Sequence, residues 1–168
     1  MSQVKIKAKR LSDTAKLPTY GSEKAACADV YADLRIHDVL EINKNKVDYK
    51  YIDYDRVIFH HLYIPPHETV KVPIGYAFEP PEGYMIQILQ KSGLASHGIV
   101  PIGGIIDEDY RGEVVVILLN TTDDKIHICH GDKIAQIAIR PYIQADFIEN
   151  NELSDTQRGC NGFGSTGK

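Results

Sequence analysis

One segment of the chain carries three carboxylates, a tyrosine and an arginine between two apolar runs. It reads Gly103-Gly-Ile-Ile-Asp-Glu-Asp-Tyr-Arg-Gly112 and joins the apolar stretches 99–106 and 114–119. This pattern is typical of a β-hairpin with polar groups at its turn. Asp107 and Asp109 either cap that turn or present carboxylates to a ligand, and the segment by itself leaves both interpretations open.

Three further short segments favour the interpretation that this turn presents its carboxylates to a ligand. Lys91-Ser92-Gly93 combines a cation, a hydroxyl and a glycine at the end of a predicted strand. Gly131-Asp-Lys-Ile-Ala-Gln136 places an amide two residues after an inward apolar position. Asp29 follows a run of small residues that lets a backbone approach closely.

The C-terminal segment from Arg158 to Lys168 contains the spacing G-x-G-x-x-G, which begins at Gly162. In dinucleotide-binding folds this spacing joins a strand to a helix, whereas residues 150–157 are polar and loop-like. The sequence therefore argues against a Rossmann fold. An arginine, an aromatic ring, two hydroxyls and exposed N–H groups suit a flexible segment that folds over a phosphorylated, ring-bearing ligand.

The elements that position these residues are predicted to be short β-strands. Apolar residues alternate at Val70 and Val72, and short apolar runs occupy 85–89 and 114–119. Turn-forming residues separate the runs at 65–66, 80–83, 121–124 and 130–132. The one plausible helical turn lies near 92–96. This pattern predicts an all-β sandwich, jelly roll or barrel.

Composition limits the class of protein. The 168 residues, 43% hydrophobic and 25% charged, fit one domain with a real core. A net charge of −4 argues against a broad nucleic-acid surface. The odd set Cys27, Cys129 and Cys160 favours a reducing compartment, and no signal peptide or membrane span is visible. We therefore expect a cytoplasmic protein with no nucleic-acid or membrane partner.

In their order along the chain, the segments of Asp29, Lys91, the hairpin, Gln136 and the C-terminus resemble the trimeric dUTP diphosphatases, or dUTPases. The resemblance runs from Lys5 to Lys168 and rests mainly on the hairpin and on Arg-Gly-x-x-Gly-Phe-Gly-Ser-Thr-Gly. It implies a distorted jelly-roll β-barrel over residues 1–151 and a flexible lid over 152–168. The family shares each active site among three subunits: one supplies the segments of Asp29, Lys91-Ser92 and Gln136, a second the hairpin, and a third the tail.

The resemblance also implies an activity, the Mg²⁺-dependent hydrolysis of dUTP to dUMP and diphosphate. This reaction keeps uracil out of DNA and supplies dUMP for thymidylate synthesis. Asp107 matches the catalytic base, which activates a water for attack on the α-phosphate. Because the phosphates and water hold most of the Mg²⁺ coordination, no direct protein ligand is expected, and Asp29 contributes only indirectly.

The remaining matched residues contact substrate in the family. Tyr110 matches the tyrosine that packs on the deoxyribose, and Phe163 matches the aromatic that stacks on uracil. Backbone near Gly104 and Val115 reads the base in a pocket too tight for the thymine methyl. The positions matched to phosphate binding are Lys91, Ser92, Gly93, Gln136, Arg158, Gly164, Ser165 and Thr166.

Three positions depart from the family pattern. Lys91 stands where arginine is usual, so a bidentate fork becomes a point charge. Cys27-Ala28 replaces a common Gly-Tyr, and residues 99–102 lack the asparagine that many relatives carry near the uracil. Base recognition is then expected to rest on backbone and water.

Residues 37–63 form a longer connection than is usual in the family. Val47, Tyr49 and Tyr51 alternate, and residues 43–45 are suited to the turn of a hairpin. The segment is interpreted as a surface elaboration, and its tyrosines leave a partner-binding arm as the alternative.

Several histidines are candidate metal ligands. The candidate ligands are His60, His61 and the group His127-x-Cys129-His130. Strand alternation puts His127 and Cys129 on one face. A fourth ligand is missing nearby, so the sequence favours ordinary strand residues over a structural zinc site.

Two other functions remain as alternatives. The dCTP deaminases share the predicted fold but carry a glutamate ten residues after the aspartate matched by Asp107, where this chain has Ile117. A nucleotide-dependent regulatory protein would use the fold to bind a partner. The presence of Asp107 and of the complete tail argues against loss of catalysis.

Overall fold

The computed structural model describes residues 4–34, 41–42, 45–46, 50–54 and 57–161. Within these residues β-strands dominate, and α1 (Ser92–Ala95) is a single helical turn. The strands are β1 (Lys7–Arg10), β2 (Thr19–Tyr20), β3 (Ala28–Tyr31), β4 (Glu41–Ile42), β5 (Asn45–Lys46), β6 (Lys50–Tyr54), β7 (Val57–Ile64), β8 (Thr69–Pro73), β9 (Tyr76–Glu79), β10 (Tyr84–Leu89), β11 (Ile99–Ile102), β12 (Ile105–Ile106), β13 (Val115–Asn120), β14 (Ile126–Cys129) and β15 (Lys133–Pro141). The all-β prediction and the predicted helical turn are both confirmed.

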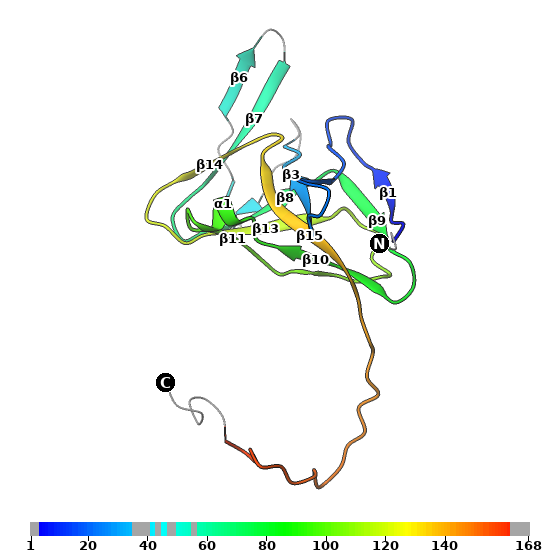
Figure 1. The fold of residues 1–168 in the computed structure, drawn as a ribbon. Coiled ribbons are helices and arrows are strands. Elements are labelled where there is room, and N and C mark those ends of the chain that lie inside the picture. Colours follow the sequence, from blue (N-terminus) through cyan, green and yellow to red (C-terminus); the bar gives the residue numbers. More distant parts are fainter. Residues whose placement is uncertain (1–3, 35–40, 43–44, 47–49, 55–56, 162–168) are drawn as a thin grey trace.

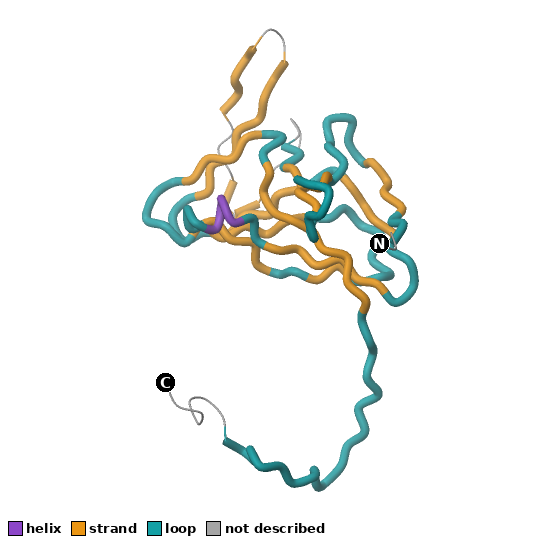
Figure 2. Tube along the Cα trace, in the orientation of Figure 1, coloured by secondary structure: helices purple, strands orange, loops and turns teal. Residues whose placement is uncertain are grey.

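The strands are antiparallel and form several small sheets rather than one closed ladder in the described parts of the chain (Figures 1 and 2). The largest sheet has the order β12-β10-β15-β3-β2. Two three-stranded sheets, β11-β13-β8 and β14-β7-β6, and the pairs β1-β9 and β4-β5 complete the set. The arrangement is of the jelly-roll type, in which packed sheets share one core.

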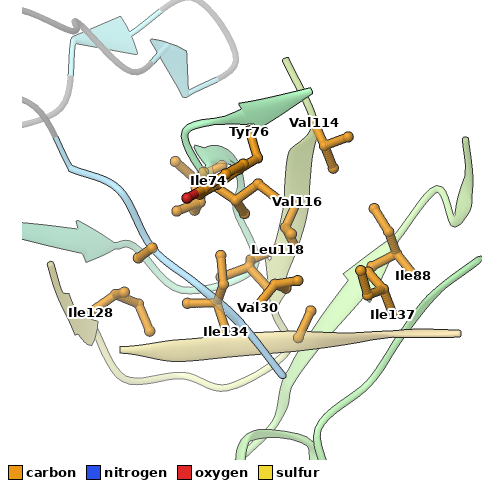
Figure 3. Packing of buried hydrophobic residues seen from close by; sticks show 14 of the residues in the cluster. Val30, Ile74, Tyr76, Ile88, Val114, Val116, Leu118, Ile128, Ile134 and Ile137 are labelled. Atoms are coloured by element: carbon orange, nitrogen blue, oxygen red, sulfur yellow. The ribbon is translucent and has the colours of Figure 1, made fainter. Parts of the chain in front are cut away.

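Alternation along the strands builds that core. In β13 every second residue, Val116, Leu118 and Asn120, is buried, and β10 buries Ile86 and Ile88 in the same way. Figure 3 shows side chains from β3, β10, β13 and β15 meeting in the cluster. Because removing such a side chain from water stabilises the fold by about 1.5–3 kcal/mol, the cluster supplies most of the driving force for folding.

Asn120 is the polar group that closes the core at the end of β13. Its Nδ2 donates to the carbonyl oxygens of Ile64, Pro65 and Asp124 at 3.1, 3.0 and 2.8 Å. Its Oδ1 accepts from the backbone N–H and the hydroxyl of Thr122 at 2.9 and 2.8 Å. The amide is fully buried. It therefore ties the start of the β7–β8 turn to the turn after β13.

The long connection over 37–63 contains two antiparallel pairs. Ile42 lies opposite Asn45 in the pair β4–β5, on either side of the predicted turn, whose residues 43–44 lie outside the described residues. The hairpin of β6 and β7 projects from the body (Figure 1). The end of β7 is different, because Leu62 and Ile64 are fully buried and pair with β14. The base of the hairpin thus belongs to the core.

The chain after β15 leaves the body and runs in the open without regular structure as far as residue 161 (Figure 2). Four large apolar side chains on it, Ile143, Phe147, Ile148 and Leu153, are 83–95% exposed. No helix in the described residues is long and apolar enough to cross a membrane.

Candidate active site

The segments of Asp29, Lys91 and Gln136 meet at one end of the five-stranded sheet. Gln136 on β15 lies between Leu89 on β10 and Asp29 on β3 in the strand register. Its Nε2 donates to Asp29 Oδ1 at 2.9 Å. Lys91 follows β10 and brings its Nζ to 3.7 Å from the same oxygen. A buried carboxylate, an amide and a cation therefore share one location.

Lys133 joins this group because β15 contains a bulge. In a regular strand, side chains three residues apart point to opposite faces. The register with β3 shifts between Lys133 and Ala135, and the extra residue restores a common face. Lys133 Nζ consequently lies 2.7 Å from Asp29 Oδ2, while Gln136 occupies Oδ1.

These contacts keep Asp29 ionised. Burial by itself raises the pKa of Asp29, but hydrogen bonds from Lys133 and Gln136 and the charges of Lys91 and Lys133 outweigh burial. The pKa therefore lies below its ordinary value. The hydrogen bond to Asp29 raises the pKa of Lys133 in turn. Two lysines face one carboxylate, so positive charge remains for an anionic ligand.

Ser92 and Gly93 begin α1, directly after Lys91, and both are exposed. Lys91 has extended backbone, and its carbonyl accepts from the N–H of Ala95 at 2.9 Å. The short helical turn thus presents the hydroxyl of Ser92 and the open backbone of Gly93 beside the lysine. Their role in phosphate binding stays a prediction.

Asp107 follows β12 and sits in an exposed turn. Its carbonyl accepts from the N–H of Tyr110 at 3.2 Å, so residues 107–110 form the turn. The three acidic residues Asp107, Glu108 and Asp109 line an open hollow of about 500 Å³ together with Met85 and Tyr142. The turn is therefore closed by a backbone hydrogen bond, and it presents carboxylates to a cavity.

Glu108 anchors this turn to the body. Its Oε2 accepts from the N–H of Gly83 at 2.6 Å and from the hydroxyl of Tyr142 at 2.7 Å. The hydrogen bonds from Tyr142 and Gly83 lower the pKa of Glu108, and the same contact raises the pKa of Tyr142. Glu108 is thus held by the body, whereas its neighbours Asp107 and Asp109 are exposed.

Tyr110 lies back over the turn. Its hydroxyl donates to the carbonyl of Glu113 at 3.0 Å, and a side chain at Gly112 would collide with the ring. A side chain at position 112 would therefore force the ring of Tyr110 to move. The ring of Tyr110 is 44% exposed, so one face remains free to contact a ligand.

Gly104 and Val115 lie on the two arms of the same hairpin. The β11–β13 ladder pairs Ile102 with Ile117, and each of the two predicted base-reading residues lies two positions further toward the turn. The Gly104 carbonyl accepts from the N–H of Ile88 at 2.7 Å. A Cβ at Gly104 would meet the Ile88 carbonyl at 3.0 Å, so the position is too tight for a larger residue.

One chain does not bring Asp107 to the group around Asp29. Asp107 directly follows Ile106, which pairs with Ile86, whereas Gln136 pairs with Leu89 at the other end of β10. Three steps along β10 are roughly 10 Å, and three strand spacings from β12 to β3 add roughly 14 Å across the sheet. A single phosphate cannot touch both.

In the tail, Arg158 is exposed and its Nε donates to the carbonyl of Asn161 at 2.9 Å. The predicted ligand-binding residues Phe163, Gly164, Ser165 and Thr166 lie outside the described residues.

Comparison with known proteins identifies the family. The model of the dUTPase family matches residues 53–167. A deoxyuridine 5'-triphosphate nucleotidohydrolase of Nautilia profundicola is 39% identical over 168 residues, which cover 98% of this chain and 100% of the relative. The chain belongs to the dUTPase family.

Solved dUTPase structures have the same fold. A mutant dUTPase of Staphylococcus bacteriophage 80alpha with dUpNHpp matches with a TM-score of 0.75 at 21% identity, covering 98% of this chain and 99% of that one. A mutant dUTPase from phage phi11 of S. aureus, described with a structural Mg(II) ion, matches with a TM-score of 0.69 at 18% identity, covering 90% and 99%.

Within this dUTPase, the alternative of a dCTP deaminase finds no support at Ile117. That residue lies in β13, between Lys71 on β8 and Ile102 on β11, where the deaminases carry their glutamate. An isoleucine has no group that can exchange a proton.

Two neighbours of the predicted site residues were missed by sequence reasoning. Lys133 was overlooked because regular alternation turns it away from Gln136. The signal lay in Ile134-Ala135, two consecutive apolar residues, both fully buried, that break the alternation of a half-buried strand. The structural role of Glu108 was missed because its partners Gly83 and Tyr142 are distant in sequence and become its neighbours only in the fold.

Proposed function

We propose that this dUTPase hydrolyses dUTP to dUMP and diphosphate. The observation that carries the proposal is the group of Lys91, Lys133 and Gln136 around the ionised Asp29, which lies in a chain of the dUTPase family. Lys91 and the adjoining Ser92-Gly93 turn supply a cation, a hydroxyl and backbone N–H groups for phosphate oxygens. Gln136 is oriented by Asp29 and adds a fixed amide.

Asp107 is proposed as the base. Its carboxylate orients a water and accepts a proton as the water oxygen attacks the α-phosphorus. A new phosphorus–oxygen bond forms, the bond from the α-phosphorus to the oxygen that bridges to the β-phosphate breaks, and diphosphate leaves. Asp107 is exposed beside an open hollow, as a base that must meet an incoming substrate has to be.

The residues present also fit a magnesium ion held mainly by substrate. Gln136 donates to one oxygen of Asp29, Lys133 lies beside the other, and Lys91 is nearby, so the local positive charge disfavours direct binding of a cation. In this proposal Asp29 acts through water or through the residues it orients. When bound, Mg²⁺ neutralises charge that develops on the phosphate oxygens.

We further propose that the enzyme is a homotrimer with shared sites. The separation of Asp107 from the Asp29 group along and across the sheet supports a site built from more than one subunit. The four exposed apolar residues of the tail support the same conclusion, because an isolated chain leaves them in water. An apolar groove on the body, lined by residues such as Leu17, Tyr20 and Phe78, is a surface of matching character.

In this assembly the tail over 152–168 acts as a lid on a neighbouring site. Arg158, Ser165 and Thr166 bind phosphate oxygens, the backbone of Gly164 approaches them closely, and Phe163 stacks on the base. The three cysteines are free, which supports a reducing compartment such as the cytoplasm. The segment over 37–63 stays a candidate partner-binding arm.

A diphosphate-release assay with dUTP, dCTP, dTTP and UTP tests the activity. We expect strong preference for dUTP, and ammonia release from dCTP would instead point to a deaminase.

Subunit mixing tests the assembly. Asp107→Asn and a variant truncated after Gln157 are each expected to be inactive, and a mixture that has exchanged subunits should regain activity. A monomer in light scattering, or no regain after exchange, would contradict shared sites.

A further inference from the structure

Three metal-binding side chains meet at the base of the projecting hairpin. His61 comes from β7, and His127 and Cys129 come from β14. One ligand atom from each lies within 4.8 Å of the other two. His61 Nδ1 and His127 Nε2 face each other in direct contact, and the Cys129 sulfur lies 3.6 Å from the first and 3.8 Å from the second.

The strand register explains this meeting. Cys129 lies directly opposite His61 in the β7–β14 ladder, and His127 precedes Cys129 by two residues, so it points to the same face. His130 takes no part, because its Nδ1 accepts from the N–H of Leu34 at 3.1 Å in the following turn. His61, far away in sequence, thus takes the place beside His127 and Cys129 that local spacing would have given to His130.

The surroundings hold these side chains in place. His61 is 8% exposed, and its ring stacks on that of His127 with 4.4 Å between ring centroids and 4° between planes. The ring of Tyr63 also packs against that of His127, with 4.8 Å between ring centroids. Asp132 Oδ2 accepts from the N–H of Cys129 at 2.7 Å and so fixes the turn after β14. An ion at this position would not need to order a flexible loop.

The donor types and distances select the class of ion. Imidazole nitrogens and a thiolate suit Zn²⁺, whereas Mg²⁺ and Ca²⁺ prefer oxygen ligands. For a tetrahedral zinc ion, bonds of about 2.0–2.1 Å to nitrogen and 2.3 Å to sulfur place sulfur and nitrogen about 3.6 Å apart. The sulfur–nitrogen distances of 3.6 and 3.8 Å agree with this spacing. His127 is exposed, so a small displacement of its ring is enough for the facing nitrogens to part and admit an ion.

We propose that His61, His127 and Cys129 form a zinc site that cross-links β7 to β14 at the base of the hairpin. Three protein ligands leave the fourth position to a water molecule. The site is distinct from the proposed Mg²⁺ position, which takes its ligands from phosphates. Its role is to hold the projecting strands β6 and β7 to the body through side chains as well as backbone hydrogen bonds.

The test uses the full-length, untagged protein, stripped with EDTA and then kept in excess Mg²⁺ so that oxygen-type sites are occupied. Zn²⁺ titrated by calorimetry is expected to bind one ion per chain. Co²⁺ used as a probe should give the intense near-ultraviolet absorption of a thiolate ligand. Cys129→Ser should abolish that absorption and weaken Zn²⁺ binding at least about tenfold. The matched controls Cys27→Ser and His67→Asn should bind as the wild type does.

Hydrogen exchange supplies a second measurement. Zn²⁺ should slow exchange of the backbone N–H groups of Leu62 and Ile128 in the wild type and leave them unchanged in Cys129→Ser. Thermal unfolding without zinc checks that Cys129→Ser is folded. If Cys129→Ser does not fold, His127→Asn, which changes an exposed ligand, replaces it in both measurements. Failure of the wild type to bind Zn²⁺, equal binding by the folded variants, or cobalt spectra without the thiolate band would each overturn the proposal.

Discussion

Gln136 lies directly opposite Asp29 across β15 and β3, and its amide donates to the Asp29 carboxylate at 2.9 Å. This contact orients an otherwise rotatable amide at the edge of the proposed phosphate site. Lys133 Nζ lies 2.7 Å from the second carboxylate oxygen, so each oxygen of Asp29 has a donor beside it. We propose that the residue acts as a positioning group.

The first prediction concerns the pH dependence of stability at Asp29. Because its pKa is lowered in the folded state, its stabilising contribution is complete above the unfolded value of about 3.9 and disappears as pH falls through the still lower folded value. Asp29→Asn should be less stable than the wild type at pH 7 by about 1–3 kcal/mol. Denaturant unfolding should show this gap closing below pH 4, and a constant gap from pH 7 to 3 would contradict the assignment.

A second prediction concerns the base. Asp107→Asn should lower kcat by about 10²-fold or more while dUTP binding stays near that of the wild type, since an amide can hold a water but cannot take its proton. Steady-state kinetics and calorimetry with a non-hydrolysable analogue measure the two effects. Asp109→Asn, two residues away in the same exposed turn, is the matched control and should retain activity. Near-normal turnover by Asp107→Asn would remove Asp107 from the mechanism.

Sugar selectivity is assigned to the ring of Tyr110, which packs over Gly112. Tyr110→Ala should raise the relative rate on UTP and leave discrimination against dTTP intact, because the proposed base contacts lie at Gly104 and Val115. Tyr110→Phe keeps the ring and loses only the hydrogen bond to Glu113, so it should still reject UTP. The measurement is the ratio of kcat/KM for dUTP to that for UTP and to that for dTTP, in the wild type and in both variants. A gain in dTTP hydrolysis would instead place Tyr110 beside the base.

The tail gives a fourth prediction, that bound nucleotide protects it from protease. Arg158 is exposed, and trypsin should cut after it readily in the free enzyme. A non-hydrolysable dUTP analogue with Mg²⁺ should slow this cut, because the proposed stacking of Phe163 on the base would contribute about 1–3 kcal/mol toward closure. Cleavage after Lys125, in the turn before β14, serves as the control and should not change. Equal rates after Arg158 in both states would reject a closing lid.

The fifth prediction tests the buried amide of Asn120. Asn120→Asp should destabilise the protein by about 3 kcal/mol or more, because a carboxylate would face the three carbonyls that now accept from Nδ2. Denaturant unfolding measures the loss. Asn151→Asp, on the exposed tail, makes the same chemical change without burial and should be neutral.

Local pattern was sufficient for most elements of the fold. Short apolar runs at 85–89 and 114–119 predicted β10 and β13, and the polar segment between the stretches 99–106 and 114–119 predicted the hairpin that carries Asp107. Period-two burial depends only on neighbouring residues, so it can be read directly from the chain. The residues of the site were recognised for a different reason, because the resemblance to a family assigned them their roles.

Tertiary structure decided how those residues meet. The bulge in β15 turns Lys133 to the same side as Gln136, and nothing in local propensity determines where a strand slips by one residue. Pairing of β7 with β14 brings His61 to Cys129 across an interval of 68 residues, which no spacing rule anticipates. The sequence determined which side chains are available, and long-range strand pairing determined which of them share a site, because register is set by burial of whole faces and not by neighbouring residues.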